Sequence, residues 1–328
     1  MCAQCDSVMI KLFMFLIALS SLAAYRVKSC SISRVSPFVL SQSKLCHCRH
    51  SPQQLKNTMG KILHWVKDVN QMDMKDITRL KNDVSKHGVV VIKNQHLTRN
   101  QQEVFTAKLG KIIILPSSFQ GNSSYLGHPA IAVVSNYWQN GSWKGPQHSF
   151  GQYWHKDGDY FPYPNNFIFS ILYGDEISDF LEGGDTGFID GCLAAENAPQ
   201  SILDVLNSTK ITVKVSFIDD FRNGLKDHLA QYATVKHNFI SKHPLNKRDC
   251  VFMFKVSKEQ ELFYTQEELR AFDEMWKYLL QDKFFYFHKW SQSDILIWDN
   301  MAVFHRAMPI NDKGEKRIMY RTMVRIEV

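Results

Sequence analysis

Three candidate metal ligands, far apart in the sequence, place the strongest constraint on how this chain can fold. His155 and Asp157 are two residues apart, and side chains at that spacing lie on one side of an extended backbone. His305 follows much later, after the apolar run 295–298. Two histidines and one carboxylate form a facial triad, a ligand set that suits non-haem Fe(II) and leaves coordination positions open. A fold that uses these residues must therefore bring His305 to the 155–157 segment.

Two further motifs support this interpretation, because His-x-Asp alone also occurs by chance. The segment Glu182–Thr186 follows the first ligand pair, and Arg317–Arg321 follows His305. A guanidinium fork together with a hydroxyl group suits the binding of a carboxylate. The sequence therefore indicates an anion-binding region in addition to the metal ligands.

The order of these motifs resembles the taurine dioxygenase/2,4-dichlorophenoxyacetate dioxygenase (TauD/TfdA) family of Fe(II)/2-oxoglutarate-dependent oxygenases. Ser293 departs from the family pattern, which usually has Gly before the Asp, but this change concerns a turn. Gly158 and Asp159 lie where family members vary with substrate. The resemblance covers about residues 75–328 and rests on residues 87–92, 105–110, 154–157, 183–186, 243–244, 290, 294–300, 305 and 317–321.

The resemblance implies a role for each of the chemical residues. His155, Asp157 and His305 are expected to hold Fe(II). Thr186 and Arg317 are expected to bind the distal carboxylate of 2-oxoglutarate. Arg321 lies four residues further on the same expected strand, and we expect it to bind either an acidic group of the substrate or the cosubstrate. The candidate substrate-wall residues, which could equally be core residues, are His128, Asn136, Tyr153, Tyr163 and Phe304.

The resemblance further implies an oxygenase that consumes 2-oxoglutarate and O2 and releases succinate and CO2. A small molecule would be hydroxylated, desaturated or oxidatively cyclised, with a carboxylate or an amine as candidate recognition groups. One alternative is a non-catalytic jelly-roll protein that binds a small molecule. Another is a cupin-type metal enzyme without 2-oxoglutarate, which Thr186 and Arg317 disfavour. Substrate identity and oligomeric state stay open.

Short apolar segments predict a mainly β fold with flanking helices, arranged as a double-stranded β-helix (jelly roll), which the resemblance also implies. A polar loop near the site is expected at 139–149, and a lid at 219–237. Helices are expected at 76–86, 98–109, 198–207 and 265–281, with Thr98, Asn197 and Thr265 as N-caps, the last in a capping box with Glu268. Strands are expected at 89–92, 112–115, 130–134, 167–173, 211–218, 251–254, 284–290, 295–299 and 317–326.

Charge and composition divide the chain into a leader, residues 1–58, and one oxygenase-like domain, residues 59–328. The formal net charge is +7, but nine lysines and arginines and no acidic residue lie between Ser7 and Lys67. The remainder, with 30 basic and 32 acidic residues, is close to neutral. We therefore expect no nucleic-acid-binding surface.

The leader has features of a targeting sequence. The apolar run Leu12–Ala24 is too short for a stable membrane span and is typical of a signal-peptide core, while Arg26–His50 resembles a transit peptide. These features predict delivery to a plastid or another organelle. The alternative is a cytoplasmic protein that begins near Met59.

Cysteine usage also separates the leader from the domain. Five cysteines precede residue 50, and only Cys192 and Cys250 lie in the domain. We therefore expect no disulfide scaffold in the domain, in agreement with a reducing compartment. The cluster around Cys46 is expected to belong to the leader and not to a metal site.

Overall fold

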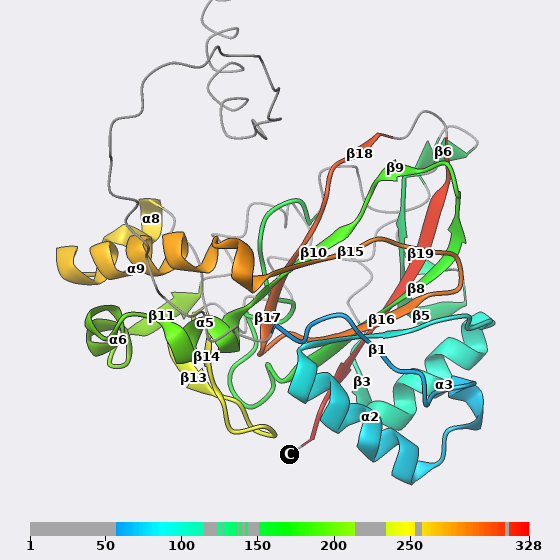
Figure 1. The fold of residues 1–328 in the computed structure, drawn as a ribbon, viewed down its shortest axis with the longest axis horizontal. Helices are drawn as coiled ribbons and strands as arrows, with labels where there is room; N and C mark the ends of the chain where they lie inside the picture. The colour runs from blue at the N-terminus through cyan, green and yellow to red at the C-terminus, as the bar shows by residue number, and fades with distance from the viewer. Residues whose placement is uncertain are drawn as a thin grey trace, which may run out of the picture. The chain divides into compact units, whose positions relative to one another are not determined.

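A computed structural model describes most of the chain after the leader (Figure 1). The expected leader, the polar loop 139–149 and the expected lid 219–237 lie mostly or wholly outside the described residues. Within the described residues, no helix has the length and apolar character needed to cross a membrane. The structure describes residues 57–114, 124–125, 127–136, 138–139, 142–143, 151–213, 234–252, 258–311 and 315–327.

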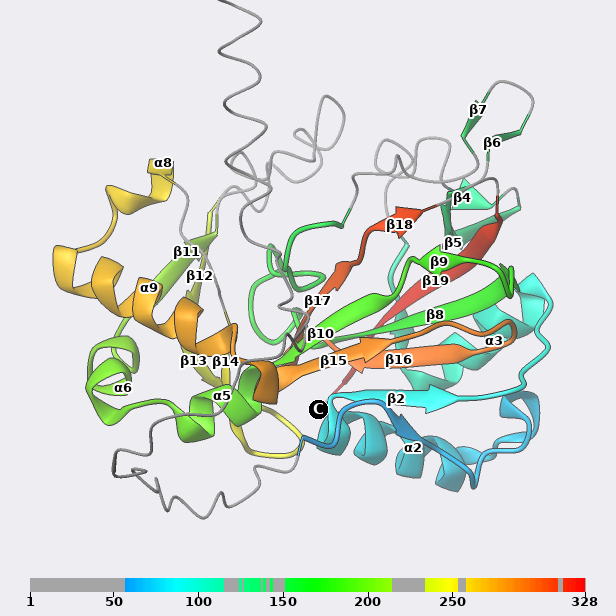
Figure 2. The ribbon, with the colours of Figure 1, turned by 45° about the horizontal axis from the view of Figure 1, so that its top comes forward.

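The largest sheet has eight strands, in the order β1-β2-β16-β8-β19-β5-β4, with β3 also paired to β19 (Figure 2). In this sheet β1 and β2 are parallel, and the other described pairs are antiparallel. β19 therefore lies inside the sheet, between β8 and β5. The strands are β1 (Lys61–Ile62), β2 (Val89–Ile92), β3 (Lys111–Ile112), β4 (Ser124–Tyr125), β5 (His128–Ser135), β8 (Ile168–Ile177), β16 (Ile295–Asp299) and β19 (Arg317–Arg325).

A second, three-stranded sheet lies against one face of the first. Its order is β15-β10-β17, with β15 (Phe285–His288), β10 (Thr186–Asp190) and β17 (Val303–Ala307). One apolar cluster joins the two sheets: Leu172 and Met319 come from the large sheet, and Phe188 and Val303 come from the small one. The mainly β class is therefore confirmed.

Side-chain alternation explains how the large sheet is buried on both faces. On β2, Val89 and Val91 join the cluster between the sheets, whereas Val90 and Ile92 pack in a cluster with α2 (Met74–His87) and α3 (Arg99–Leu109). Adjacent residues of a strand point to opposite faces, so a continuous apolar run is required here. The predicted strand 89–92 and the predicted helix beginning after Thr98 are confirmed, the latter with a Thr98–Gln101 capping box.

A mixed region extends from the small sheet around a third apolar cluster. α9 begins after a capping box between Thr265 and Glu268, as the sequence predicts. The cluster packs α9 against α5 and α6, and it includes Ile189 of β10 and Phe304 of β17. The elements of this region and the remaining short ones are α5 (Gly191–Asn197), α6 (Gln200–Leu206), α8 (Lys258–Glu261), α9 (Gln266–Leu279), β11 (Lys210–Val213), β12 (Val235–Asn238), β13 (Ile240–Lys242), β14 (Asp249–Val251), β9 (Glu182–Gly183), β18 (Ile310–Asn311), β6 (Trp138–Gln139), β7 (Ser142–Trp143), η1 (Val69–Gln71) and η5 (Asp282–Phe284).

The predicted helix 198–207 is wrong at its start. Asn197 does not cap a following helix; it ends α5, and its side-chain amide donates to the Leu193 carbonyl. The α5 N-cap is Asp190, whose carboxylate accepts from the Leu193 amide. α6 then begins after Pro199, because proline suits a helix start and interrupts α5.

Cys192 and Cys250 form a disulfide, although the cysteine usage predicts a domain without a disulfide scaffold. The two residues are far apart in sequence, but α5 packs against β14 and buries both side chains. Disulfides persist mainly in oxidising environments, so the two cysteines do not support the predicted reducing compartment. The location of the protein itself stays a prediction.

Reduction of this disulfide is expected to lower the free energy of unfolding by about 2–4 kcal/mol, because the bond closes a loop between residues separated by 58 positions. Urea unfolding with and without reductant measures the change. The Cys192→Ala/Cys250→Ala variant is the control and should not respond to reductant. Equal stability of the wild-type protein in both conditions would contradict a formed disulfide.

Candidate metal centre and anion-binding region

Backbone pairing brings the 155–157 segment to the strand that carries His305. The His155 amide donates to the His305 carbonyl at 3.0 Å, and the His305 amide donates to the His155 carbonyl at 2.9 Å. Beside this bridge, the buried Lys156 ammonium donates to the Met301 carbonyl at 2.7 Å. The antiparallel bridge supplies the convergence that the sequence spacing requires.

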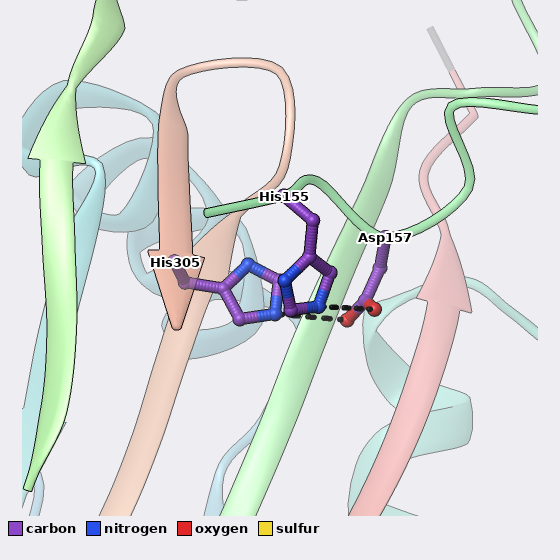
Figure 3. Close-up of side chains that lie close together, drawn as sticks. All are labelled: His155, Asp157 and His305. Atoms are coloured by element: carbon purple, nitrogen blue, oxygen red, sulfur yellow. Dashed lines mark ion pairs between the residues drawn. The ribbon is translucent and has the colours of Figure 1, made fainter. Parts of the chain in front are cut away.

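His155, Asp157 and His305 point toward one another (Figure 3). His155 Nε2 lies 3.9 Å from Asp157 Oδ1, and His305 Nε2 lies 3.7 Å from Asp157 Oδ2. One potential ligand atom from each residue falls within a cluster in which all atoms lie within 4.8 Å of one another. Two nitrogen donors and one oxygen donor on one side of a point are the donor set that Fe(II) takes in a facial triad.

Neighbouring groups orient each of the three side chains. His155 Nδ1 lies 2.8 Å from the Tyr153 carbonyl, so Nδ1 donates to that carbonyl and Nε2 is the nitrogen that faces Asp157. The Ser170 hydroxyl donates to Asp157 Oδ2 at 2.7 Å. The His305 ring packs against Trp298 and Phe188, with ring centroids 4.9 and 6.3 Å away.

The electrostatics of the cluster favour the protonation states that metal binding requires. Burial by itself would raise the pKa of Asp157, but Arg321, the two histidines and the Ser170 hydrogen bond together hold it well below its usual range. Burial, followed by the effect of His155, lowers the pKa of His305 well below its usual value. A carboxylate and a neutral imidazole are the ligand forms of these residues, so the donor set fits a divalent cation.

Thr186 and Arg317 come from the two facing sheets, and Arg317 lies beside Gly184 and Asp185, which directly precede Thr186. Arg317 is buried, and burial lowers the pKa of its guanidinium to about 10, against the opposing effect of Asp185. Among the described residues, Arg317 Nε has no hydrogen-bond partner. A buried guanidinium without a bonded acid is unfavourable unless an anion binds there. The geometry therefore fits an anion-binding site.

The Thr186 hydroxyl can donate a hydrogen bond to a bound anion. Trp290 Nε1 donates to Thr186 Oγ1 at 3.0 Å. Because the oxygen already accepts one hydrogen bond, its own proton is available to an incoming anion. Trp290 is among the family-pattern residues, but the sequence assigned it no function.

Gly184 provides the room that the Arg317 side chain needs. Its φ is 73°, in the left-handed region that favours glycine, and a Cβ at this position would lie 3.2 Å from Arg317 Cδ. The Gly183–Gly184 pair therefore allows β9 and β10 to pass close to the guanidinium.

Replacing Trp290 with Phe is expected to raise the KM for 2-oxoglutarate roughly fivefold. The indole N–H no longer fixes the Thr186 hydroxyl, and one hydrogen bond contributes about 1 kcal/mol. Steady-state kinetics with 2-oxoglutarate varied measure the change. Trp65→Phe is the matched control, because it removes an indole hydrogen bond to Asp83 at the α2 side. Equal KM values in the two variants would contradict the assignment.

Arg321 lies closer to the metal ligands than to the Thr186 end. Its Nη1 is 3.4 Å from Asp157 Oδ1, and its Nε is buried without a hydrogen-bond partner among the described residues. Met319, between the two arginines on β19, belongs to the apolar cluster between the sheets. Alternate residues of a strand lie on one face, so Arg317 and Arg321 both point toward the small sheet, one on each side of Met319.

The candidate substrate-wall residues separate into two groups. Tyr153 is partly exposed, and its ring lies 5.0 Å from the His155 ring. Tyr163 is 60% exposed, and no contact with the three ligands is recorded for it among the described residues. Tyr153 therefore lies beside the cluster, whereas Tyr163 is not brought to it.

Three other candidates have other structural partners. Phe304 precedes His305 on β17 and so points to the opposite face, into the α5–α9 cluster. Asn136 Oδ1 accepts from the Arg317 backbone N–H at 2.7 Å, and Asn136 Nδ2 donates to the Glu315 carbonyl. His128 pairs with Glu103 of α3. None of the three is placed beside the metal ligands.

Sequence reasoning missed two residues that contact Asp157. Ser170 donates to its carboxylate, and Asn300 Oδ1 accepts from its backbone amide at 3.0 Å. Asn300 lies in the family-pattern range 294–300 but has no chemical role assigned from the sequence, and Ser170 lies unmarked in a predicted strand. A period-2 pattern would place Ser170 on the same face as Leu172, but it does not say which loop crosses that face.

The fold and the cluster together define a class of protein: a mainly β protein with two histidines and one carboxylate arranged to hold a metal ion, and with a separate buried arginine suited to an anion. A family model described as "Taurine catabolism dioxygenase TauD, TfdA family" matches residues 53–323. The chain belongs to this family. It is a 2-oxoglutarate-dependent dioxygenase, and the family depends on Fe(II), 2-oxoglutarate and O2.

Two curated relatives cover most of the domain. The (S)-phenoxypropionate/alpha-ketoglutarate-dioxygenase of Sphingobium herbicidovorans is 22% identical over 259 residues, which cover 73% of this chain and 82% of the relative. The alpha-ketoglutarate-dependent 2,4-dichlorophenoxyacetate dioxygenase of Cupriavidus pinatubonensis is 24% identical over 254 residues, with coverages of 72% and 83%. Both are named as alpha-ketoglutarate-dependent enzymes.

Solved structures show the same fold at low sequence identity. A taurine dioxygenase from Burkholderia xenovorans matches with a TM-score of 0.61 and 21% identity, covering 83% of this chain and 89% of that one. AAD-2, solved in complex with Mn(II) and N-oxalylglycine, matches with a TM-score of 0.62 and 20% identity, with coverages of 83% and 97%. The fold is therefore shared with dioxygenases of this family.

Proposed function

We propose that the protein oxidises a small, anionic organic molecule in an Fe(II)- and 2-oxoglutarate-dependent reaction that releases succinate and CO2. His155, Asp157 and His305 would hold the iron, and Thr186 with Arg317 would bind the distal carboxylate of 2-oxoglutarate. The observation that carries the proposal is the convergence of the three ligand atoms within 4.8 Å, on the same pair of sheets as the buried Arg317, whose Nε has no hydrogen-bond partner in the described part of the chain.

The proposed iron ligands and the proposed carboxylate-binding residues would have different functions. The iron, when bound, would supply the activation of dioxygen. Thr186 would donate its hydroxyl proton to the cosubstrate carboxylate, while Arg317 would supply its positive charge and two N–H groups. The apolar cluster between the sheets would lower the local dielectric constant and so strengthen both contacts. These tasks fit a double-stranded β-helix, whose two sheets would enclose the site.

Arg321 supports an anionic substrate. It lies beside the metal ligands, and its only hydrogen-bonded acid in the described part of the chain is the ligand Asp157, at 3.4 Å. A carboxylate on the substrate would provide a better partner while placing the rest of the molecule beside the metal. The names of the two curated relatives describe enzymes acting on phenoxy-carboxylates. Hydroxylation, desaturation and cyclisation share this requirement for placement.

A screen for substrate-dependent succinate release tests the proposed function. The purified protein is incubated with Fe(II), ascorbate and 2-oxoglutarate, and a panel of small carboxylates is compared with amines and neutral analogues of matched size. We expect carboxylates to stimulate succinate release above the uncoupled background. His305→Ala provides the background for each compound. No stimulation by any carboxylate, with stimulation by amines, would reject the anionic substrate class.

We also propose that catalysis resides in residues 59–328. The leader differs from the domain in charge and composition, and every residue assigned above lies after it. A chain that begins at Met59 is expected to match the full chain in kcat and KM for 2-oxoglutarate. A soluble, folded but inactive shortened chain would contradict the proposed boundary.

A further inference from the structure

The side-chain amide of Asn300 lies beside the proposed metal ligands and makes four hydrogen bonds. Its Nδ2 donates to the Ile168 carbonyl at 3.1 Å and to Ser170 Oγ at 3.0 Å. Its Oδ1 accepts from Trp298 Nε1 at 3.1 Å and from the Asp157 amide at 3.0 Å. The side chain is buried. Because all four hydrogen-bonding positions of the amide are used, its orientation is fixed.

This fixed amide sets the direction of the next hydrogen bond. Ser170 Oγ accepts from Asn300, so the serine proton is directed to its other close partner, Asp157 Oδ2, at 2.7 Å. Ser170 is completely buried. A chain of donors therefore runs from Asn300 through Ser170 and ends on the carboxylate. On the other side, Arg321 reaches Asp157 Oδ1 only at 3.4 Å.

Asn300 thus holds Asp157 at two points, the backbone amide and the carboxylate. Rotation of the carboxylate about its side-chain bonds would break the Ser170 contact, and a shift of the loop would break the amide contact. Groups that orient metal ligands typically affect metal affinity as well as position.

We propose that Asn300 and Ser170 are positioning residues that hold Asp157 in its metal-binding orientation, with Asn300 acting largely through Ser170. The inference rests on the proposed metal site and adds a function to Asn300, in the turn after β16, and to Ser170, within β8. The adjacent Asp299 shows the contrast, because its carboxylate bonds to His243 at 2.7 Å and to Ser85 at 3.3 Å and has no recorded contact with the metal ligands.

The test measures the dissociation constant for Mn(II) alone, by electron paramagnetic resonance of the free ion, in full-length variants. Ser170→Ala is expected to raise this constant about tenfold or more, and Asn300→Ala at least as much. If Asn300 acts through Ser170, the double variant should lie within about twofold of Asn300→Ala. Ser85→Ala removes a buried hydroxyl from Asp299 and is expected to bind Mn(II) like the wild-type protein.

Thermal unfolding without metal separates positioning from folding. Ser170→Ala removes one hydroxyl and is expected to unfold within a few degrees of Ser85→Ala while binding Mn(II) more weakly. If Asn300→Ala does not fold, the Mn(II) dissociation constant of Ser170→Ala alone decides whether the inference holds. An Mn(II) constant for Ser170→Ala within twofold of wild type, or additive effects in the double variant, overturns the inference. If wild type and His305→Ala bind Mn(II) equally, the proposed metal site fails instead, and the inference fails with it.

Discussion

Replacement of His305 by alanine is expected to abolish turnover while leaving the fold intact. The side chain supplies one of the three ligand atoms, and two remaining donors hold a first-row metal poorly. His305 is a residue of β17, whose pairing with β10 uses backbone atoms that alanine retains. Succinate release and Mn(II) binding should both fall to background, and thermal unfolding should show a folded protein.

The control for this experiment is His128→Ala. His128 is a partly exposed histidine that pairs with Glu103 of α3. Its loss should leave metal binding and turnover unchanged. Near-normal activity of His305→Ala with added Fe(II) would show that the three-residue metal site is wrong.

Arg317→Ala is expected to raise the KM for 2-oxoglutarate about 30-fold or more. Loss of a bidentate contact to a carboxylate costs about 2–5 kcal/mol, and each 1.4 kcal/mol is a factor of ten. The buried guanidinium has an Nε without a hydrogen-bond partner among the described residues, so this donor is available to the cosubstrate. Kinetics with 2-oxoglutarate varied at saturating substrate measure the change.

Arg321→Ala should give a different pattern. We expect weaker substrate binding and more succinate released per substrate oxidised, with a smaller effect on the KM for 2-oxoglutarate. Arg325→Ala is the matched control, because Arg325 lies four residues further on β19 and bonds to the Asn165 carbonyl. Equal loss of 2-oxoglutarate affinity in the Arg317 and Arg321 variants would show that both arginines serve the cosubstrate.

The elements that sequence predicts best are those with a strong local signal. β16 was predicted at its observed bounds, and α9 was predicted with its Thr265–Glu268 capping box. The apolar run of β16 is buried on both faces, and the capping box of α9 is formed by residues three apart. Both signals are contained within one element, so one sequence is sufficient to find them.

The elements that sequence misses are those created by distant pairing. β10 and β17 pair with each other, Phe188 opposite His305, yet neither Thr186–Asp190 nor Val303–Ala307 has a clear strand pattern. Glycine and polar site residues interrupt both runs. The metal ligands were recognised by their chemical type, but Phe304 was assigned to the substrate wall because the direction of β17 was not known. Once His305 is known to face the large sheet, Phe304 must face away from it.

The position of β19 has a consequence for biosynthesis. The last strand of the sequence lies between β8 and β5, so those two strands are synthesised well before the strand that joins them. Until residues 317–325 leave the ribosome, both edges stay unpaired, and unpaired edges favour association with other chains. A premature stop before Arg317 would therefore remove the middle of the sheet and not its margin. We expect such a product to be cleared by proteolysis or to aggregate, without accumulating as a partly active enzyme.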